Sequence, residues 1–462
     1  MSMGPSLSGI AELELWSMIS LASTARDLFL QTVARLDVGR VIANHLSCSQ
    51  GVFRAGTLSY ATGQFDRIVI IAIGKAAIPM SDKVFEIFSS AHMESLKIEG
   101  IVVSNVPAES SKPNLRYFVG GHPLPTHESR RAAETILSTL ASCNEASLVL
   151  FLISGGASAL MEKPLDSIVS DAETLGFHKA LVDSGLPITE MNCVRKHFSA
   201  VKGGRLALAA PTATQVTLLI SDVPEGALDM VGSGPTMPDG STAEECRRLV
   251  SKSPLRDLIP PGIRDRLLDS GLEETPKPGH RAFDRATHLC LLSEADVVRE
   301  ASALAAARGF QVFVDNRCDD WNYEDAADHL LARIRDLSRT FQKVCLLSSG
   351  ELSVPLPAEV GTGGRNQQFA LACALRLHPE DGNLTVLSAG TDGLDGNSSA
   401  AGAVVDASTC PDAIRHRLDP LHHKENYDSF PLLNRLGASI IIGPTGNNLR
   451  DLRILLSSRA NA

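Results

Sequence analysis

A lysine stands where an apolar run, long enough for one buried strand, passes into a predicted helix. Lys75 follows Gly74 and the run 68–73, and helical periodicity starts at residue 76. The helix dipole disfavours a cation there, so a phosphate bound between the two positive elements would explain the placement. A solvated loop lysine explains it equally well. A Walker A motif is excluded, because Val69 stands where that motif requires its first glycine.

The segment 154–160, SGGASAL, is a second strand-to-helix turn, rich in glycine and hydroxyl groups. The backbone N–H groups and serine hydroxyls of such a turn hold phosphate or carboxylate oxygens. A structural turn and a nucleophilic serine are the alternatives, and the second lacks the G-x-S-x-G pattern of a nucleophile elbow. We expect a substrate-binding anion cradle formed by Ser154, Gly155, Gly156 and Ser158.

The stretch 190–208 has the periodicity of an amphipathic helix. Its predicted buried stripe consists of Met191, Val194, Phe198 and Val201. A polar row at the same spacing, rotated by roughly 100°, consists of Asn192, Arg195, Ser199 and Lys202. Beside other anion-binding elements this row favours carboxylate or phosphate recognition through Asn192, Arg195 and Lys202; a solvated basic face is the alternative. His197 lies elsewhere on the helix, and we expect it to be structural.

Asp222 comes at the end of the predicted strand 215–221. An aspartate there can accept the proton of a substrate hydroxyl or hold Mg²⁺, and capping of the following turn is the alternative. The next loop, VGSGPTMPD, adds further hydrogen-bond donors. We expect Ser233 and Gly234 of this loop, together with Gly74, to contact a nucleotide.

Arg365 repeats the placement of Lys75 in the second half of the chain. It opens a predicted helix after the glycine-rich segment GTGG, and a bound phosphate would again explain a cation at a helix N-terminus. Such an arginine resembles the one that neutralises charge in phosphoryl transfer. The segment is not G-x-G-x-x-G, so dinucleotide binding is not supported. The expected nucleotide contacts here are Glu351, Gly363, Gly364 and Asn366.

GTDGLDG, residues 390–396, carries Asp392 and Asp395 on one turn. The D-x-D-x-D-G spacing of an EF-hand is absent. A direct or water-bridged contact with Mg²⁺ is one interpretation, and an ordinary Asx turn is the other.

The elements that must position these residues alternate between strands and helices, as in βαβ units of an α/β fold. Strands are predicted at 67–73, 100–104, 115–120, 147–153, 215–221, 287–293, 310–314, 343–348, 384–388 and 438–442. Helices are predicted at 23–36, 76–90, 127–141, 171–184, 190–208, 241–251, 294–308, 323–340 and 366–377. Helix 23–36 is expected on the first sheet, and capping boxes are expected at Ser170–Glu173 and Ser241–Glu244. Prolines in 252–283 suggest a junction between domains 1–265 and 266–462, with a C-terminal helix at 446–462 packing back on the first.

Length, charge and cysteine usage restrict the class of protein. A chain of 462 residues is too long for one ordinary core. The net charge of −10 argues against nucleic acid and anionic membranes as partners. Nine scattered cysteines without a CxxC pair suit free thiols in the cytoplasm. No basic n-region followed by a long apolar run marks a signal peptide, and no 18-residue apolar run marks a membrane span.

Taken in order, these segments resemble the motifs of the glycerate 2-kinase family, whose C-terminal half contains a module called MOFRL. The matching segments are IAIGKAA, GGHPLPTHES, ISGGASAL, NCVRKHFSAVKGGRLA, ISDVPEG, GSGPTMPD, ETPKPG, SSGE, GGRNQQFALA, GTDGLDG and GPTGNN, which extend from about residue 24 to 452. Two departures stand out. Ala157 replaces a frequent glycine, and NSSAAGA replaces a frequent PTDAAGA, which removes an acidic side chain near Asp392.

The resemblance implies two α/β domains, the first Rossmann-like with a mainly parallel sheet, and an active site in the interdomain cleft. The MOFRL module would occupy about residues 340–452. It further implies transfer of the γ-phosphoryl group of ATP, with Mg²⁺, to the 2-hydroxyl of D-glycerate, giving 2-phosphoglycerate. The catalytic residues carried over by motif are Lys75, Asp222, Arg365 and Asp392, with Asp222 and Asp392 at the metal. We also expect a homodimer.

Two rival functions are open at this point. A hydroxypyruvate reductase would need a nicotinamide fingerprint, yet IAIGKAAIPM contains a single glycine, Gly74. A non-catalytic sugar-phosphate-binding regulator would bind its ligand without turnover, and the charged set that the chain retains argues against it.

Overall fold

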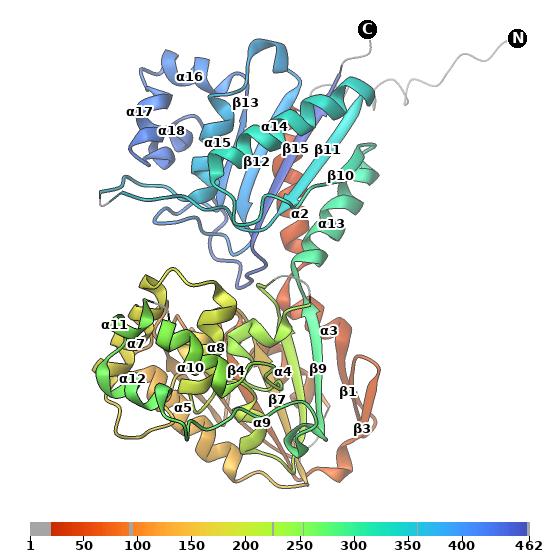
Figure 1. Cartoon of the computed structure of the whole chain (residues 1–462). Helices are drawn as coiled ribbons and strands as arrows, with labels where there is room; N and C mark the ends of the chain where they lie inside the picture. Colours follow the sequence, from red (N-terminus) through yellow and green to blue (C-terminus); the bar gives the residue numbers. More distant parts are fainter. Residues whose placement is uncertain (1–19, 92–95, 224–225, 253, 358, 460–462) are drawn as a thin grey trace, which may run out of the picture. The chain divides into compact units, whose positions relative to one another are not determined.

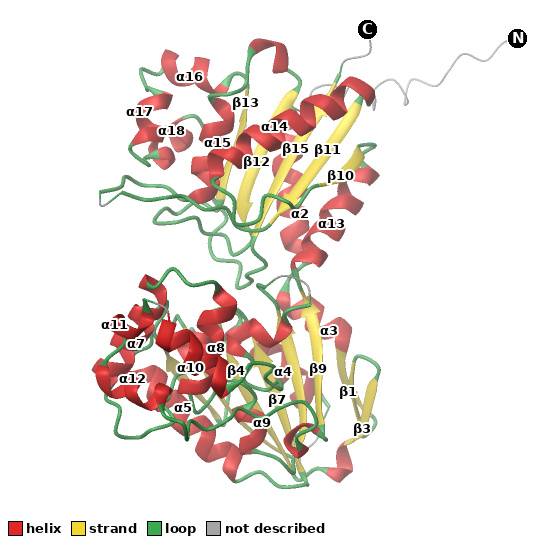
Figure 2. Cartoon of the chain, in the orientation of Figure 1, coloured by secondary structure: helices red, strands yellow, loops and turns green. Residues whose placement is uncertain are grey.

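The computed structural model describes residues 20–91, 96–223, 226–252, 254–357 and 359–459 (Figure 1). Its contacts divide the chain into two compact units, Val38–Ser293 and a second composed of Met1–Asp37 and Glu294–Ala462. After their sheets we call these the parallel unit and the mixed unit. Figure 2 shows helices packed beside the strands in each unit, as the alternating sequence pattern predicts.

The parallel unit is built on six parallel strands in the order β6-β5-β4-β7-β8-β9. These are β4 (Arg67–Ile73), β5 (Lys97–Ser104), β6 (Leu115–Val119), β7 (Ser147–Ile153), β8 (Thr214–Ile220) and β9 (Ala286–Leu292). Counted along the chain, the order is 3-2-1-4-5-6, the doubly wound order of Rossmann-type folds. All residues of β7 and β8 are buried, as expected of parallel strands covered on both faces. The predicted α/β fold with a mainly parallel sheet is confirmed.

Helices of the parallel unit largely follow the sequence pattern. They are α3 (Val38–His45), α4 (Ala77–Ser90), α5 (His127–Ala141), α6 (Ala157–Leu160), α7 (Asp171–Asp183), α8 (Ile188–Phe198), α9 (Arg205–Ala209), α10 (Ala243–Lys252), α11 (Leu255–Leu258) and α12 (Pro261–Leu268). A small antiparallel sheet is added by β1 (Leu46–Ser49), β2 (Val52–Ala55) and β3 (Leu58–Ala61). The capping box of Ser170 and Glu173 is confirmed. The second predicted capping box, Ser241 with Glu244, is wrong by one residue. At the start of α10 it is Thr242 Oγ1 that accepts the N–H of Glu245.

The predicted helix 190–208 is two helices. α8 ends at Phe198, and Ser199 is extended, with φ −98° and ψ 138°. Gly203 and Gly204 then adopt positive φ angles of 57° and 83° before α9 begins. The polar row of the sequence analysis is therefore broken after Arg195, and Lys202 lies outside α8.

The mixed unit contains a six-stranded sheet in the order β10-β11-β15-β12-β13-β14, in which only the β10–β11 pairing is parallel. Its strands are β10 (Gln311–Val314), β11 (Lys343–Ser349), β12 (Leu384–Gly390), β13 (Gly402–Asp406), β14 (Ser439–Ile440) and β15 (Asp451–Ser458). Its helices are α2 (Leu21–Arg35), α13 (Glu294–Ala307), α14 (Tyr323–Thr340), α15 (Arg365–Ala374), α16 (Thr409–Arg415), α17 (Pro420–Glu425) and α18 (Ser429–Arg435). In Figure 1, α14 and α15 cross the face of the sheet opposite α2.

Three sequence-based expectations about domain organisation differ from the structure. The division after residue 265 is too early, because β9 pairs with β8 and belongs to the parallel unit. The first predicted helix, α2, contacts β12 and β15 of the mixed unit instead of the first sheet. The predicted helix 446–462 is wrong: Asp451–Ser458 is the strand β15, hydrogen-bonded to β11 and β12. A short apolar run that is buried on both faces has no alternation to distinguish it from a helix.

No helix within the described ranges is both long and apolar enough to cross a membrane.

Candidate functional site

Two strand-to-helix turns meet where the strand order of the parallel sheet reverses, between β4 and β7. Ile73 is in register with Ile153, so the turns that begin at Gly74 and Ser154 leave the sheet at the same level. In doubly wound sheets this switch point, beyond the carboxyl ends of the strands, is where ligands bind. Lys75 follows β4, and Ser154, Gly155 and Gly156 follow β7, so the fold brings both predicted motifs to one edge.

The two turns are locked together by hydrogen bonds. Lys75 N–H donates to the Gly155 carbonyl at 2.9 Å, and Ala76 N–H donates to Ser154 Oγ at 3.0 Å. Gly74 has φ 131°, and a Cβ atom there would lie 2.1 Å from Ser154 Oγ. Gly74 is therefore required by its close contact with Ser154. This contact explains the glycine without a bound nucleotide, which the sequence analysis expected there.

Lys75 is held at the start of α4, as predicted, and a histidine that the sequence analysis did not assign lies near it. His122 follows β6 in the motif GGHPLPT, and its ring lies against Gly156. Partial desolvation of the ring, and to a smaller extent the Lys75 ammonium, hold the pKa of His122 below its ordinary value of 6.5. The sequence signal that could have identified His122 is its position just after the predicted strand 115–120.

Ser158, Ser233 and Asn192 form a chain of hydrogen bonds beside the SGGASAL turn. The hydroxyls of Ser158 and Ser233 lie 2.9 Å apart, and Ser233 donates to Asn192 Oδ1 at 2.9 Å. Ser233 and Asn192 are buried. The predicted nucleotide contact Ser233 is thus a partner of the predicted substrate residues Ser158 and Asn192. Gly234, next to it, has φ 61°, and its Cβ would lie 2.4 Å from the Asp229 carbonyl, so packing explains this glycine.

Arg195 on α8 is half-buried and adjoins this chain, with Nη1 3.5 Å from Asn192 Oδ1. Its Nε is buried and has no hydrogen-bond partner among the described residues. Burial lowers the pKa of Arg195, and the nearby Glu162 carboxylate opposes that effect. A half-buried guanidinium whose buried Nε has an unused donor is suited to receive an oxyanion.

Lys202 does not join the substrate group. Its ammonium is fully buried and donates to Glu162 Oε2 at 2.6 Å and to the Met161 carbonyl at 3.2 Å. Glu162 also accepts hydrogen bonds from His178 at 2.7 Å and Ser199 at 2.5 Å. Burial would raise the pKa of Glu162, but Lys202 and His178 outweigh it and hold the pKa at about 2. A substrate could reach Lys202 only by breaking this ion pair, so we assign Lys202 a structural role.

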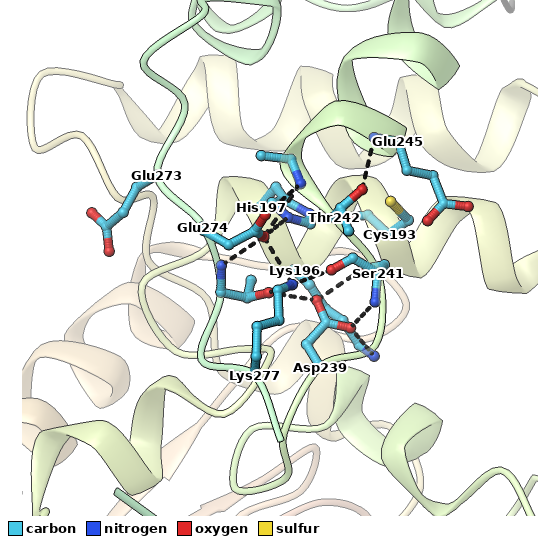
Figure 3. Close-up of polar contacts among 12 residues, drawn as sticks. Cys193, Lys196, His197, Asp239, Ser241, Thr242, Glu245, Glu273, Glu274 and Lys277 are labelled. Carbon is cyan, nitrogen blue, oxygen red and sulfur yellow. Dashed lines mark hydrogen bonds and ion pairs between the residues drawn. The ribbon is translucent and has the colours of Figure 1, made fainter. Parts of the chain in front are cut away.

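The remaining cationic residues of α8 anchor the helix (Figure 3). Lys196 Nζ lies 3.1 Å from both Asp229 and Asp239, and Asp239 also accepts from Ser241 and Thr275. His197 is bonded through Nδ1 to the Cys193 carbonyl and through Nε2 to Glu274. The expectation that His197 is structural is confirmed. These contacts fix the helix that presents Asn192 and Arg195.

Asp222 lies on the same edge of the parallel sheet, one strand further along. β8 is in register with β7, with Leu219 opposite Ile153. Ser221 N–H donates to the Leu292 carbonyl at 2.8 Å, which fixes the strand end just before the half-buried Asp222. Pro224 and Glu225 of the ISDVPEG motif lie outside the described residues.

Arg365 of the mixed unit is bound by two carboxylates. Its Nε and Nη2 donate to Asp451 at 2.6 and 3.2 Å, and its Nη1 donates to Glu351 at 2.8 Å. Burial would lower the pKa of Arg365, but Asp451 and Glu351 raise it above its ordinary value. The structure therefore explains a cation at the start of α15 without the bound phosphate that we expected.

The N-terminus of α15 is capped by the protein itself. Asp395 accepts the N–H groups of Asn366 at 3.1 Å and Gln367 at 2.9 Å. Burial raises the pKa of Asp395 to about 6 even though these donors oppose it. A Cβ at Gly364 would lie 2.3 Å from the Asp395 carboxyl carbon, so this glycine makes room for the cap.

Two other predicted nucleotide contacts of this region have protein partners. Gly363 N–H donates to Asn397 Oδ1 at 2.8 Å. Asn366 is buried, donates to Asp395 at 3.3 Å, and accepts the Ser388 hydroxyl at 2.6 Å. Both contacts support the fold of the mixed unit.

Asp392 and Asp451 both approach Gly390. A Cβ at Gly390 would lie 3.0 Å from Asp392 Oδ1 and 3.4 Å from Asp451 Oδ1. Asp392 Oδ1 also accepts the N–H of Leu394 at 3.1 Å, which is the Asx turn of the alternative interpretation. In the described part of the chain, no group of three or more His, Cys, Asp or Glu residues could hold a metal ion. Both oxygens of Asp451 are bonded to Arg365, so Asp392 is the carboxylate here that could contact Mg²⁺, which is commonly held by one or two carboxylates together with substrate phosphates.

Comparison with known proteins places the chain among phosphotransferases. Residues 24–268 match a family described as a domain of unknown function, DUF4147, and residues 344–451 match the MOFRL family. A D-glycerate 2-kinase from Thermotoga maritima is 35% identical over 84% of this chain and 90% of its own length. A putative hydroxypyruvate reductase from Agrobacterium vitis is 32% identical over 84% of this chain and 99% of its own. A crystal structure of glycerate kinase from Thermotoga maritima superposes with a TM-score of 0.80 at 31% identity, covering 95% of this chain and 99% of that one. The chain belongs to the glycerate 2-kinase family.

Proposed function

We propose that this protein is a D-glycerate 2-kinase, which transfers the γ-phosphoryl group of ATP to the 2-hydroxyl of D-glycerate and releases 2-phosphoglycerate and ADP. The observation that carries the proposal is the pair of turns at the switch point of the parallel sheet. There the cation of Lys75 adjoins a glycine turn, and no acceptor among the described residues takes the N–H groups of Gly155 and Gly156. Amide donors beside an ammonium suit an oxyanion.

We assign the acceptor substrate to the parallel unit. The Gly155 and Gly156 amides, the Ser154 and Ser158 hydroxyls and the guanidinium of Arg195 would bind the carboxylate of D-glycerate. Asn192 would orient Arg195 and Ser158 through the hydrogen-bonded chain. Asp222 would orient the 2-hydroxyl and take its proton as the new oxygen–phosphorus bond forms.

We assign phosphate binding to Lys75 and to Arg365 of the mixed unit. Phosphoryl transfer depends mainly on positioning and charge neutralisation, which these cations would supply. Because Asp451 is buried and holds two nitrogens of Arg365 while Glu351 is partly exposed and holds one, Nη1 is the group we expect to exchange to a phosphate. Asp392 would hold Mg²⁺ in the mixed unit and Asp222 in the parallel unit, and the ion would neutralise phosphate charge. That the active site lies between the two domains stays a prediction.

A hydroxypyruvate reductase is the alternative that one relative's name suggests. Dinucleotide folds place the pyrophosphate on the N–H groups of the first strand-to-helix turn. Here the N–H groups of Lys75 and Ala76 are used by Gly155 and Ser154. That packing, together with the missing glycine fingerprint, disfavours nicotinamide binding.

Two parallel assays of the purified protein discriminate the functions. With ATP, Mg²⁺ and D-glycerate, the kinase assignment predicts ADP formation that depends on glycerate. With NADH or NADPH and hydroxypyruvate, it predicts no loss of absorbance at the nicotinamide band. Nicotinamide oxidation without ADP formation would establish the reductase instead. Ligand binding without either reaction would favour a regulator.

The cysteines bear on the cellular compartment. All nine are free thiols, which supports our expectation of the reducing cytoplasm. A homodimer is a further expectation, to be measured by sedimentation.

A further inference from the structure

His122 and Lys75 flank the same glycine of the switch-point edge. A Cβ at Gly156 would lie 3.2 Å from His122 Cδ2, 3.4 Å from His122 Nε2 and 3.4 Å from Lys75 Cγ. Gly156 has φ 84°, so its conformation also favours glycine. The absence of a side chain at Gly156 thus leaves room for the imidazole and the lysine stem beside the open amides.

The segment that carries His122 is fixed on both sides. Gly120 N–H donates to the Ser104 carbonyl at 2.9 Å, and Gly121 N–H donates to Ser129 Oγ at 3.0 Å. A Cβ at Gly120 would lie 2.4 Å from the Leu160 carbonyl, and one at Gly121 would lie 2.2 Å from the Leu124 carbonyl. His122 therefore leaves β6 from a rigid support packed on α6 and α5, as a group that binds substrate requires.

His122 is exposed as a residue although the protein partly covers its ring, and neither ring nitrogen has a hydrogen-bond partner among the described residues. The charged side chain that faces it is Lys75. The SGGASAL turn brings no titratable group. The first titratable side chains of α5 are bonded to residues other than His122. His127 lies 2.8 Å from Asp171, and Arg131 donates to Glu128 at 2.7 Å.

We propose that His122 is a catalytic residue that hydrogen-bonds an oxyanion at this edge, held either by the Gly155–Gly156 amides or by Lys75. The shared chemistry is an oxyanion, either the carboxylate of D-glycerate or the γ-phosphoryl group of ATP. The inference rests on the proposed kinase function and adds a contact from β6 to those from β4 and β7. A bound anion favours the imidazolium over the neutral ring, so occupancy of the site raises the pKa of His122, which is otherwise held below 6.5 by burial and Lys75.

Histidine NMR tests the contact without turnover. The Cε1–H resonance of His122, assigned by its loss in His122→Gln, is titrated with pH in the free protein, with D-glycerate, with a non-hydrolysable ATP analogue and Mg²⁺, and with inorganic phosphate. We expect the midpoint to rise by about one pH unit or more with the ligand that His122 touches. The glycerate and nucleotide arms tell the carboxylate from the phosphoryl group. His288, which bonds the Thr236 carbonyl at 2.9 Å, is the internal reference and should keep its midpoint.

Kinetics provide the second readout. We expect His122→Ala to lower kcat/KM by roughly 10- to 100-fold, the effect of losing a hydrogen bond to a charged group, and His122→Gln to recover part of it. His416→Ala, an exposed histidine of the mixed unit, is the matched control with unchanged rates. Wild-type turnover with an unmoved His122 midpoint in every arm and a His122→Ala rate within twofold would overturn the inference and leave the proposed function intact. If the wild type makes no phosphoglycerate, the proposed function fails, and the phosphate titration still decides whether His122 binds an oxyanion.

Discussion

Replacing Glu162 by glutamine should destabilise the parallel unit strongly. The side chain of Glu162 is 1% exposed, and its partners Lys202 and His178 are 0% and 5% exposed. Glutamine has nearly the same shape and keeps an acceptor for Ser199. It leaves the Lys202 ammonium buried without a counter-charge. The loss should therefore be one of charge compensation, with little loss of packing.

Two arguments give the magnitude. A pKa of about 2 for Glu162 against an ordinary 4.5 corresponds to roughly 3 kcal/mol of stability at neutral pH. Removing one partner of a buried ion pair costs about 3–5 kcal/mol in other proteins. We expect about 3–4 kcal/mol. Since the pKa is lowered in the folded state, this stabilisation is complete above about pH 4.5. It is lost as the pH falls through about 2, so the deficit of the variant should shrink below pH 4.5.

The assay must report on the parallel unit alone. Of the two tryptophans, Trp321 belongs to the mixed unit and Trp16 lies outside the described residues, so tryptophan fluorescence is unsuitable. Hydrogen exchange followed by mass spectrometry, read on peptides from β7 and α8, measures opening of the parallel unit directly.

Two variants control the experiment. Glu86→Gln breaks the exposed pair of Lys83 and Glu86 in the same unit and should change stability by less than about 0.5 kcal/mol. Glu162→Gln/Lys202→Met removes both charges and should recover most of the loss. A Glu162→Gln protein within about 1 kcal/mol of the wild type would refute the reasoning.

Three further predictions concern the candidate site. Lys75→Ala and Arg365→Ala should each lower kcat by roughly 10³-fold in a steady-state ADP assay, as loss of a charge-stabilising cation does; near-normal turnover in either variant removes that residue from the mechanism. Asp451→Asn should lower kcat/KM for ATP by roughly 10-fold or more, because the buried partner that orients Arg365 loses its charge, whereas Glu351→Gln should stay within about threefold; the reverse ranking contradicts the proposed exchange of Nη1. The carboxyl carbon of Asp395, followed by NMR, should titrate with a midpoint of about 6, because burial raises its pKa; a midpoint at or below 4 would show that the cap of α15 is well solvated.

Much of the fold was predictable because strands such as β4, β7 and β8 are nearly continuous apolar runs between helical segments. Predicted strands such as 67–73 and 147–153 coincide with β4 and β7. What could not be predicted was which unit a segment joins. The pattern of α2 shows that one face is apolar, and only the three-dimensional structure shows that this face packs on β12 and β15. β15 was mistaken for a helix because a strand buried on both faces lacks alternation.

The candidate site was predictable to the level of the edge on which it lies. Register places Gly74 beside Ser154, so residues at parallel strand ends converge as expected. The partners of each residue were not predictable. Lys202 was expected to bind a carboxylate or phosphate in one helical row with Arg195, but the chain turns after Phe198 and buries Lys202 on Glu162. Arg365 looked as if it required a phosphate, but Asp451 lies far along the chain and supplies the negative charge.

The position of the phosphoryl group on the product tests the central claim most directly. ATP, Mg²⁺ and D-glycerate are incubated with the enzyme, and the phosphorus spectrum of the product is recorded without proton decoupling. The proposed function predicts a doublet, because the phosphorus of 2-phosphoglycerate couples to the single proton on C2. A triplet, from the two C3 protons of 3-phosphoglycerate, or no glycerate-dependent product would contradict it.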